Sequence, residues 1–235
     1  MKPVAIFRFS SSEGPAYLAD WLDRHALDWR LVAIDEGASV PLDPLAYSGI
    51  GMMGGPMSVT DPLPWIAPLS DLLRRAIACG VPVIGHCLGG QLLAQALGAR
   101  VERTAMPEIG WIDVDAPDPA SRRDWFGGRP RFTAFQWHGE VFALPQGAIR
   151  VLANAFNPNQ GFIVDGIHLG LQCHVEMTPA LVETWCDIAA AEIAAPTLPS
   201  LQPRGEILRD LPTRIGALQA VADDVYARWA QALRG

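Results

Sequence analysis

Short apolar runs alternate with helix-like segments over the first hundred residues of the chain. Each run is five or six residues long and is bounded by polar or turn-forming positions. This alternation predicts buried parallel strands joined by helices, because such strands are covered on both faces. The predicted strands are Val4–Phe9, Arg30–Asp35, Gly49–Met53 and Val81–Gly85, and the predicted helices are Pro15–Leu27, 64–80 and Leu88–Leu97.

The pattern changes between about residues 99 and 170. Alternating and β-branched runs such as "IGWIDVD", "RFTAFQW" and "GFIVDG" follow one another, separated by short turns rich in Gly, Pro and Asn. A period of two is typical of strands that bury one face. We therefore expect further strands here, antiparallel in part.

The C-terminal part is predicted to be helical. Thr178 is placed to cap a helix that begins at Pro179 and extends to about Ile193, where "AAPTLPSLQP" ends it. From residue 204 onward a second helix carries an apolar stripe, which must face the main domain, a second copy of the chain or the pocket. The stripe consists of Leu211, Ile215, Leu218, Ala222, Val225 and Trp229.

These patterns predict an α/β fold with a central, mostly parallel sheet flanked by helices, a smaller antiparallel β portion and an appended C-terminal helix. A length of 235 residues suits one large α/β domain. We place that domain at residues 1–195, followed by a linker and helical tail at residues 196–235.

Composition favours a folded protein that acts on a small molecule. Half of the residues are hydrophobic and 18% are charged, and the net charge of −7 comes with no basic run, so nucleic acid is not expected as a partner. The N-terminus resembles neither a signal peptide nor a membrane span, which needs roughly 20 apolar residues. The four cysteines lack the spacing of a disulfide framework. We expect free thiols in the cytoplasm and no membrane contact.

Cys87 lies on a predicted strand-to-helix corner, in "VIGHCLGGQ". Gly85 and Gly89 stand two residues to either side of it, and small neighbours are needed where the backbone doubles back. The start of a helix also favours a thiolate, because the unpaired amides and the helix dipole attract negative charge. Most free cysteines only fill space, but this spacing after an apolar run indicates a nucleophile.

A nucleophilic thiol needs a base, and His174 is the first candidate. "LQCHVEM" ends a predicted strand, and the period of two would return Glu176 to the side of His174, where it could orient the ring. His138 is the rival, since Glu140 follows it at the same spacing in "QWHGE". The remaining histidines are His25, His86 and His168, which we interpret as surface or structural residues.

Metal binding is not expected. The pairs His86-Cys87 and Cys173-His174 are adjacent in sequence, and neighbours on a strand face opposite ways, so each pair could offer only one ligand easily. No C-x-x-C or H-x-x-x-H spacing occurs, and no phosphate-binding loop is present. We therefore predict neither a metal nor a cofactor.

Three separated segments resemble the class I, or triad-type, glutamine amidotransferase domain, in the order that this family shows. "GIGMMGGPMSV" resembles its glycine-rich oxyanion loop, "VIGHCLGGQLLAQALGA" its nucleophile elbow, and "GLQCHVEMT" its strand end with histidine and glutamate. The resemblance covers roughly residues 45–180 and is greatest to stand-alone relatives of the amidotransferase domain of GMP synthase. It implies a flavodoxin-like fold.

The resemblance also implies the chemistry. Cys87 would attack the side-chain amide of glutamine, His174 would protonate the departing ammonia, and Glu176 would orient His174, with a γ-glutamyl thioester as intermediate. The backbone amides of Gly55 and Leu88 would stabilise the oxyanion. Substrate would contact three further residues, namely Gln91, Trp137 and His138. Val175 stands where the family usually has proline, a change that removes no catalytic group.

Three functions remain open at this stage. The first is a glutaminase-type amidotransferase that passes ammonia to a synthetase partner, because nothing in this chain resembles a synthetase domain. The second is a γ-glutamyl peptidase that acts on peptides or conjugates and needs an open groove. The third is a non-catalytic regulatory module that keeps the fold. A homodimer through the tail helix also remains open.

Overall fold

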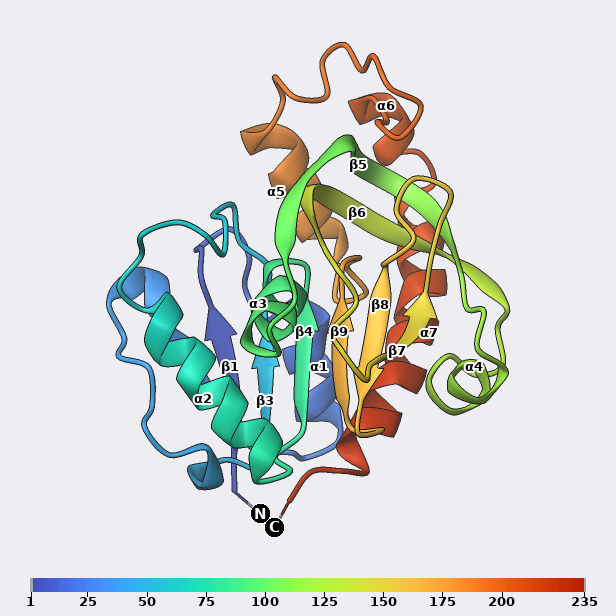
Figure 1. The fold of residues 1–235 in the computed structure, drawn as a ribbon. Coiled ribbons are helices and arrows are strands. Elements are labelled where there is room, and N and C mark those ends of the chain that lie inside the picture. The colour runs from blue at the N-terminus through green and yellow to red at the C-terminus, as the bar shows by residue number, and fades with distance from the viewer. Residues whose placement is uncertain (1, 235) are drawn as a thin grey trace.

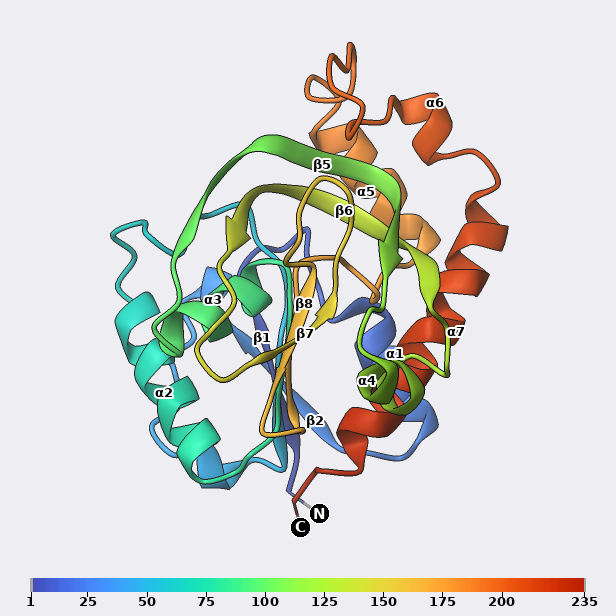
Figure 2. The ribbon, with the colours of Figure 1, turned by 45° about the vertical axis from the view of Figure 1, so that its right-hand side comes forward.

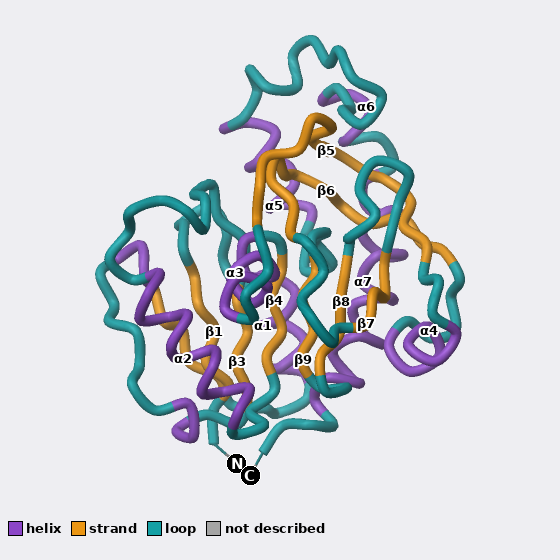
Figure 3. The backbone as a smooth tube through the Cα atoms, viewed as in Figure 1, coloured by secondary structure: helices purple, strands orange, loops and turns teal. Residues whose placement is uncertain are grey.

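The computed structural model describes residues 2–234 (Figure 1). The helices are α1 (Ala16–Arg24), α2 (Ile66–Ala78), α3 (Leu88–Ala96), α4 (Pro119–Trp125), α5 (Pro179–Ile188), α6 (Arg204–Ile207) and α7 (Leu211–Ala230). The strands are β1 (Val4–Arg8), β2 (Trp29–Ala33), β3 (Gly49–Met52), β4 (Val83–His86), β5 (Val101–Asp115), β6 (Arg131–Phe142), β7 (Ile149–Leu152), β8 (Gly161–Val164) and β9 (His168–Leu171). Figure 3 shows how they alternate with loops.

Seven strands form the central sheet, in the order β2-β1-β3-β4-β9-β8-β7. The first five are parallel, and β8 and β7 extend the sheet as antiparallel neighbours. Strands β3, β4 and β9 are buried along their whole length, as a sheet covered on both faces requires. The predicted α/β fold with a mostly parallel sheet is confirmed.

Helices cover both faces of the sheet. Figures 1 and 2 show α2 and α3 on one face and α1 and α7 on the other. Successive side chains of β1 point to opposite faces of the sheet. Ile6 packs in the core cluster on the α7 side, and Phe7 packs in the cluster on the α2 side. This two-layer packing fixes the position of each strand end.

Strands β5 and β6 form a separate antiparallel ribbon, as predicted for the middle of the chain. The ribbon arches over the carboxyl ends of the parallel strands (Figure 2). Its pairing is interrupted between Arg103 and Glu108, where the register shifts. Such an irregularity bends a ribbon and increases its twist. The arch encloses the space above the sheet edge.

Several predicted boundaries are wrong. The helix predicted to reach Leu27 ends at Arg24, and the tail predicted as one helix from residue 204 is two, α6 and α7, with Asp210 between them in a left-handed conformation (φ 52°). Strand β2 ends at Ala33, opposite the end of β1, and a 3-10 turn follows. Strand β9 ends at Leu171, opposite the first residue of β8, so the ladder stops there; the segment that follows bends away and meets β6 in a single bridge between His174 and Phe135. Helix α5 ends at Ile188, which is 65% exposed, because the next three residues, all alanine, are not buried against the domain.

The apolar stripe of the tail faces the main domain. All six of its residues are buried, and they join the core cluster that contains α1. Polar contacts add to this docking, since the hydroxyl of Tyr17 donates to Asp223 at 2.9 Å and Arg24 pairs with the same carboxylate. Within residues 2–234, no helix combines the length and the apolar character needed to cross a bilayer.

Candidate active site

The loops that follow β1, β3, β4 and β9 meet at one edge of the sheet. These strands are parallel neighbours, so their carboxyl ends lie side by side beneath the β5–β6 arch (Figures 1 and 2). In open α/β sheets ligands bind at this edge, where the loops can vary without disturbing the strands. The residues singled out from the sequence come from these loops, from the first turn of α3 and from β6.

Cys87 stands on a strained corner between β4 and α3. Its backbone has φ 48° and ψ −108°, and a positive φ of this kind costs an L-residue about 1–3 kcal/mol. Strand β4 delivers the residue to the sheet edge, and the chain turns at once into α3, whose first amides have no helical partner. The thiol is thereby held at a helix N-terminus.

Gly85 and Gly89 permit close backbone contacts around this corner. A methyl group on Gly85 would overlap the backbone of Gly89, and one on Gly89 would lie 2.5 Å from the carbonyl oxygen of Met52. Both obstacles are main chain, so no side-chain rotation relieves them. The two glycines therefore let β3, β4 and α3 approach closely enough to form the corner.

His174 and Glu176 form a buried pair in the segment after β9. The Nδ1–H of His174 donates to Oε1 of Glu176 at 2.5 Å, and backbone bonds to Phe135 and Tyr17 hold the two residues in place. Because Nδ1 carries the proton of this bond, Nε2 remains to exchange a proton elsewhere. This Nε2 makes no hydrogen bond within residues 2–234.

The two groups shift each other's pKa. Burial would raise the pKa of Glu176, but the charge and the hydrogen bond of His174 lower it to about 2. Burial would lower the pKa of His174, but the carboxylate of Glu176 and the sulfur of Cys87 raise it well above its usual value. An ionised Glu176 therefore favours a protonated His174, the form that can donate a proton.

The thiol of Cys87 has three polar neighbours. His174 is one, and the side-chain amide of Gln172 donates to the sulfur at 3.7 Å. The third is the carbonyl oxygen of Trp137, at 3.9 Å. Gln172 carries no marker in the sequence, because its burial and its approach to Cys87 depend on β4 and β9 pairing in the sheet.

Gly55 and Leu88 come together beside Cys87. A methyl group on Gly55 would lie 2.6 Å from a terminal carbon of Leu88, and Gly55 lines the same pocket as Cys87. In the described part of the chain neither backbone N–H donates a hydrogen bond to protein. Unpaired amides next to a reacting group are suited to binding a developing negative charge.

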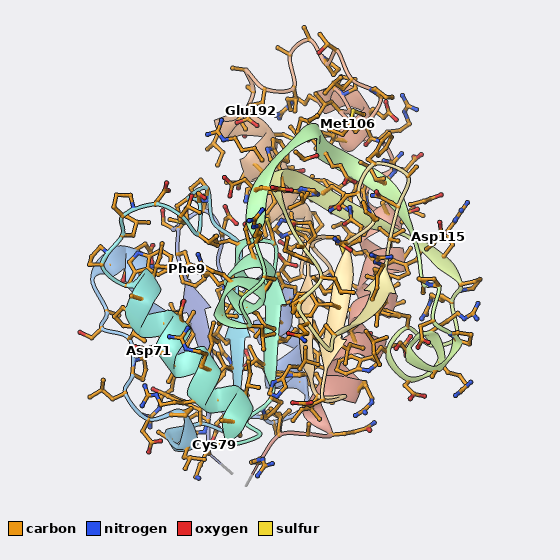
Figure 4. All side chains as sticks on the ribbon, in the orientation of Figure 1. Phe9, Asp71, Cys79, Met106, Asp115 and Glu192 are labelled. Carbon is orange, nitrogen blue, oxygen red and sulfur yellow. The ribbon has the colours of Figure 1, made fainter. Side chains whose placement is uncertain are left out.

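Gln91 and Trp137 line the pocket in different ways. The Gln91 amide group donates to the carbonyl oxygen of Glu140 at 3.1 Å and to the side chain of Gln172 at 3.2 Å, so it braces the pocket wall. The indole N–H of Trp137 donates to Glu192 at 3.2 Å, which holds the ring at the pocket rim. Figure 4 shows Glu192 beside the β5 arch.

His138 lines the pocket but is anchored away from Cys87. Its Nδ1 lies 3.1 Å from the carbonyl oxygen of Glu140, and its Nε2 lies 3.5 Å from the carboxylate of Glu108. Burial lowers the pKa of His138 to about 3 and raises that of Glu108 to about 7. Both ring nitrogens thus face other groups, and His174 is the better placed base.

The pocket beside Cys87 has a volume of about 790 Å³. Glu13, in the loop after β1, lines it and carries no marker in the sequence; burial raises its pKa to about 7, although His174 opposes the shift. Trp185 of α5 supports the same wall, since its indole N–H donates to the carbonyl oxygen of Ser12 at 2.8 Å and its ring meets His174 edge-on. Two residues missed from the sequence therefore border the candidate site.

The other cysteines differ from Cys87 in surroundings. Cys79 is exposed at the end of α2, at the opposite edge of the sheet from Phe9 (Figure 4). Cys173 and Cys186 are buried, and burial raises the pKa of both thiols. Among residues 2–234, no three His, Cys, Asp or Glu side chains are grouped so that they could hold a metal ion.

Comparison with known proteins shows the family. The family model of the class-I glutamine amidotransferases matches residues 19–184. The match spans well over half of the sequence, so the chain belongs to the class-I glutamine amidotransferase family. It is a cysteine-dependent amidotransferase enzyme, and the non-catalytic alternative is therefore set aside.

Solved structures and curated relatives agree with this assignment. The crystal structure of a glutamine amido transferase from Methylobacillus flagellatus is 41% identical with a TM-score of 0.97, covering 100% of this chain and 96% of that one. A glutamine amidotransferase from Thermotoga maritima is 25% identical with a TM-score of 0.86, over 97% of this chain and 98% of that one. A subunit of the glutamine-hydrolyzing GMP synthase of Sulfurisphaera tokodaii is 35% identical over 134 residues, which are 56% of this chain and 68% of the relative. The matches to GMP synthases of Aeropyrum pernix and Thermomicrobium roseum cover only 28% and 24% of those longer chains.

Proposed function

We propose that this enzyme hydrolyses the side-chain amide of glutamine, with Cys87 as nucleophile, His174 as general acid and base, and Glu176 as the group that orients His174. The short buried bond between His174 and Glu176 carries the proposal, because it leaves Nε2 of the ring free to serve the thiol. The strained corner at Cys87 and the family assignment add support.

In the first half of the reaction the thiolate attacks the amide carbon of glutamine. The carbonyl oxygen takes up the electron pair, and the backbone amides of Gly55 and Leu88 stabilise it; a donor of this kind is worth roughly 3 kcal/mol of barrier. His174 gives its Nε2 proton to the amide nitrogen, the C–N bond breaks, and ammonia leaves. Cys87 then carries a γ-glutamyl thioester.

In the second half water replaces the thiol. His174, now neutral, takes a proton from water as its oxygen attacks the thioester carbon. The C–S bond breaks, glutamate leaves, and the thiolate of Cys87 is restored beside a protonated His174. The negative charge of Glu176 stabilises that protonated ring in both halves of the cycle.

Three residues are proposed to hold the amino-acid part of the substrate. Trp137 and His138 contribute a pocket wall on β6, and Gln91 braces that wall through its bond to Glu140. His138 is neutral in this arrangement, so it offers a polar surface without competing for the thiol proton.

The released ammonia is proposed to pass to a separate synthetase protein. Relatives named as one subunit of a glutamine-hydrolyzing GMP synthase support this, since such a name implies a further subunit, while single-chain GMP synthases are far longer than the matched region. Glutamine as the preferred substrate is part of this proposal, whereas a homodimer through the tail helix is not, because the apolar stripe of that helix is buried against the main domain.

A γ-glutamyl peptidase is the second candidate, favoured by the size of the pocket. Its volume of about 790 Å³ falls in the range of roughly 300–1,000 Å³ that holds drug-sized ligands, which is more space than ammonia needs to leave. A γ-glutamyl peptide or conjugate could therefore place its leaving amine there. The covalent intermediate would be the same.

One assay separates the two candidates. The purified protein is incubated with glutamine and with a panel of γ-glutamyl peptides and amides, while ammonia and released amine are measured. Faster ammonia release supports the amidotransferase reaction, and faster amine release supports the peptidase. The Cys87→Ala variant is the control, and activity that survives in it would refute the nucleophile.

A further inference from the structure

The second carboxylate oxygen of Glu176 has no hydrogen-bond partner within the described residues. Oε1 accepts from His174, whereas Oε2 is buried and unpaired. The nearest ring nitrogen on its other side is Nε2 of His86, at 3.9 Å. His86 is fully buried, and the carboxylate of Glu176 therefore has one imidazole facing each of its two oxygens.

The contacts of His86 define which of its nitrogens carries the proton. Nδ1 lies 3.3 Å from the carbonyl oxygen of Met52, which can only accept, so Nδ1 bears the hydrogen. Nε2 of a neutral ring is then an acceptor, and the hydroxyl of Tyr226 lies 3.2 Å from it and donates to it. Burial lowers the pKa of His86 despite the attraction of Glu176, which agrees with a neutral ring.

Tyr226 reaches this position from α7, beyond the matched family region, which ends at residue 184. Its side chain is fully buried, and its ring meets His86 edge-on with the ring centroids 6.0 Å apart. Burial raises the pKa of Tyr226, so its hydroxyl keeps the proton that it donates. Helix α7 thus contacts His86, and His86 in turn faces Glu176, the carboxylate that orients His174.

We propose that Tyr226 is a positioning residue for the reaction, because its hydroxyl occupies Nε2 of His86 and so reserves the charge of Glu176 for His174. This inference rests on the proposed function of Glu176. The titratable groups facing His86 are Glu176 and His174 from the segment after β9 and Tyr226 from α7. Without the hydroxyl, His86 could take a proton on Nε2 and pair with Oε2 of Glu176.

A protonated His86 would make protonation of His174 less favourable. His174 would share the carboxylate of Glu176 with a positive neighbour, and its pKa would fall. Less imidazolium beside Cys87 means less thiolate at neutral pH and a smaller supply of the proton that the leaving group needs. The tail helix would then set the protonation of the site while touching neither substrate nor thiol.

The test is the rate at which iodoacetamide alkylates Cys87, followed by peptide mapping between pH 5 and 9. Tyr226→Phe keeps the ring and removes the hydroxyl, and we expect alkylation near pH 7 to slow about threefold to tenfold, as a pKa change of half to one unit in His174 would give. His86→Asn removes the competing imidazole and keeps a donor toward Met52, so it should alkylate at nearly the wild-type rate.

The double variant is decisive. With His86→Asn present, Tyr226→Phe should slow alkylation no further, because the competing base is gone. Tyr17→Phe is the matched control. It also removes the hydroxyl of a buried tyrosine, but that hydroxyl bonds to Asp223 of α7 and makes no hydrogen bond to His86. A profile of Tyr226→Phe like that of Tyr17→Phe, an additive double variant, or a slow His86→Asn variant would each overturn the inference.

The readout also separates this inference from the proposed function. Alkylation needs no substrate, so the comparison works whichever γ-glutamyl compound is cleaved. A wild type that hydrolyses no γ-glutamyl compound would refute the proposed function alone. If Tyr226→Phe does not fold, as judged by thermal melting, the profile of His86→Asn still decides, because only a supporting role for His86 would slow it.

Discussion

Glu13 and His174 both lie against the space that a side chain on Gly54 would occupy. A methyl group built there would come within 3.0 Å of Cε1 of His174 and would overlap the carboxylate of Glu13. The Glu13 side chain can swing into the pocket, but the buried ring of His174 cannot move without breaking its bond to Glu176. Gly54 therefore sets how closely the loop after β3 approaches the base.

Gly54→Ala is expected to lower activity more than stability. The new methyl pushes on His174, and a small displacement of a reacting group is costly to the rate. We expect kcat to fall about a hundredfold, which is about 2.7 kcal/mol of barrier, while the free energy of unfolding changes by less than about 1.5 kcal/mol. Steady-state kinetics and urea unfolding measure the two effects, and an equal loss in both would contradict this explanation.

Glu13→Gln is expected to change how stability depends on pH. The folded-state pKa of Glu13 is raised to about 7 from a usual value of 4.5. Because the folded protein holds this proton more tightly than the unfolded chain, the protonated carboxyl adds to the free energy of unfolding. That contribution is fully present below about pH 4.5 and is lost as the pH rises through about 7. The glutamine variant avoids that loss, so it should exceed the wild type by about 2 kcal/mol at pH 8 and match its pH trend below pH 4. Denaturant unfolding at several pH values tests this, and parallel curves for the two proteins would refute it.

Cys87→Gly is expected to be more stable than Cys87→Ala. Glycine normally destabilises a position relative to alanine, but φ 48° at this corner is unfavourable for any residue with a Cβ. We expect a difference of about 1 kcal/mol in favour of glycine, and we expect both variants to be inactive because they lack the thiol. Thermal melting of the pair measures it, and the usual order, with alanine more stable, would show that the corner is not strained.

His174→Ala and His138→Ala should differ in kinetics. Removing His174 takes away the proposed acid and base, so acylation of Cys87 should be lost. Removing His138 alters a pocket wall that its contacts to Glu108 and Glu140 hold in place, so KM should rise with a smaller change in kcat. Burst-phase kinetics with a chromogenic γ-glutamyl amide separate the two outcomes. Loss of acylation in His138→Ala alone would reverse the assignment.

Much of the fold is predictable because local patterns determine it. Apolar runs of strand length occur between amphipathic segments, and together they define the parallel sheet and its helices. The corner at Cys87 is predictable for a related reason, since two glycines at fixed spacing mark a close backbone approach within a few residues. The sequence predicts helix α5 to be longer than it is, because periodicity does not show where tertiary packing stops.

The missed residues depend on contacts between distant parts of the chain. Tyr226 and His86 are separated by 140 positions, and no local pattern links a tyrosine in a tail helix to a histidine before the nucleophile. Gln172 reaches the sulfur of Cys87, and Glu13 reaches the pocket, only because β9 and β1 lie in the same sheet as β4. The sequence predicts that His86 points away from the thiol, but it does not show that this direction leads to Glu176.

Trapping the γ-glutamyl thioester would establish the role of Cys87. The protein is mixed with glutamine or a γ-glutamyl amide, quenched in acid within the first turnovers, and digested for mass spectrometry. We predict a γ-glutamyl adduct on the peptide that contains Cys87, formed by the wild type and absent from Cys87→Ala, in step with ammonia or amine release. Substrate hydrolysis without an adduct on Cys87, or unchanged hydrolysis by Cys87→Ala, would contradict the proposed mechanism.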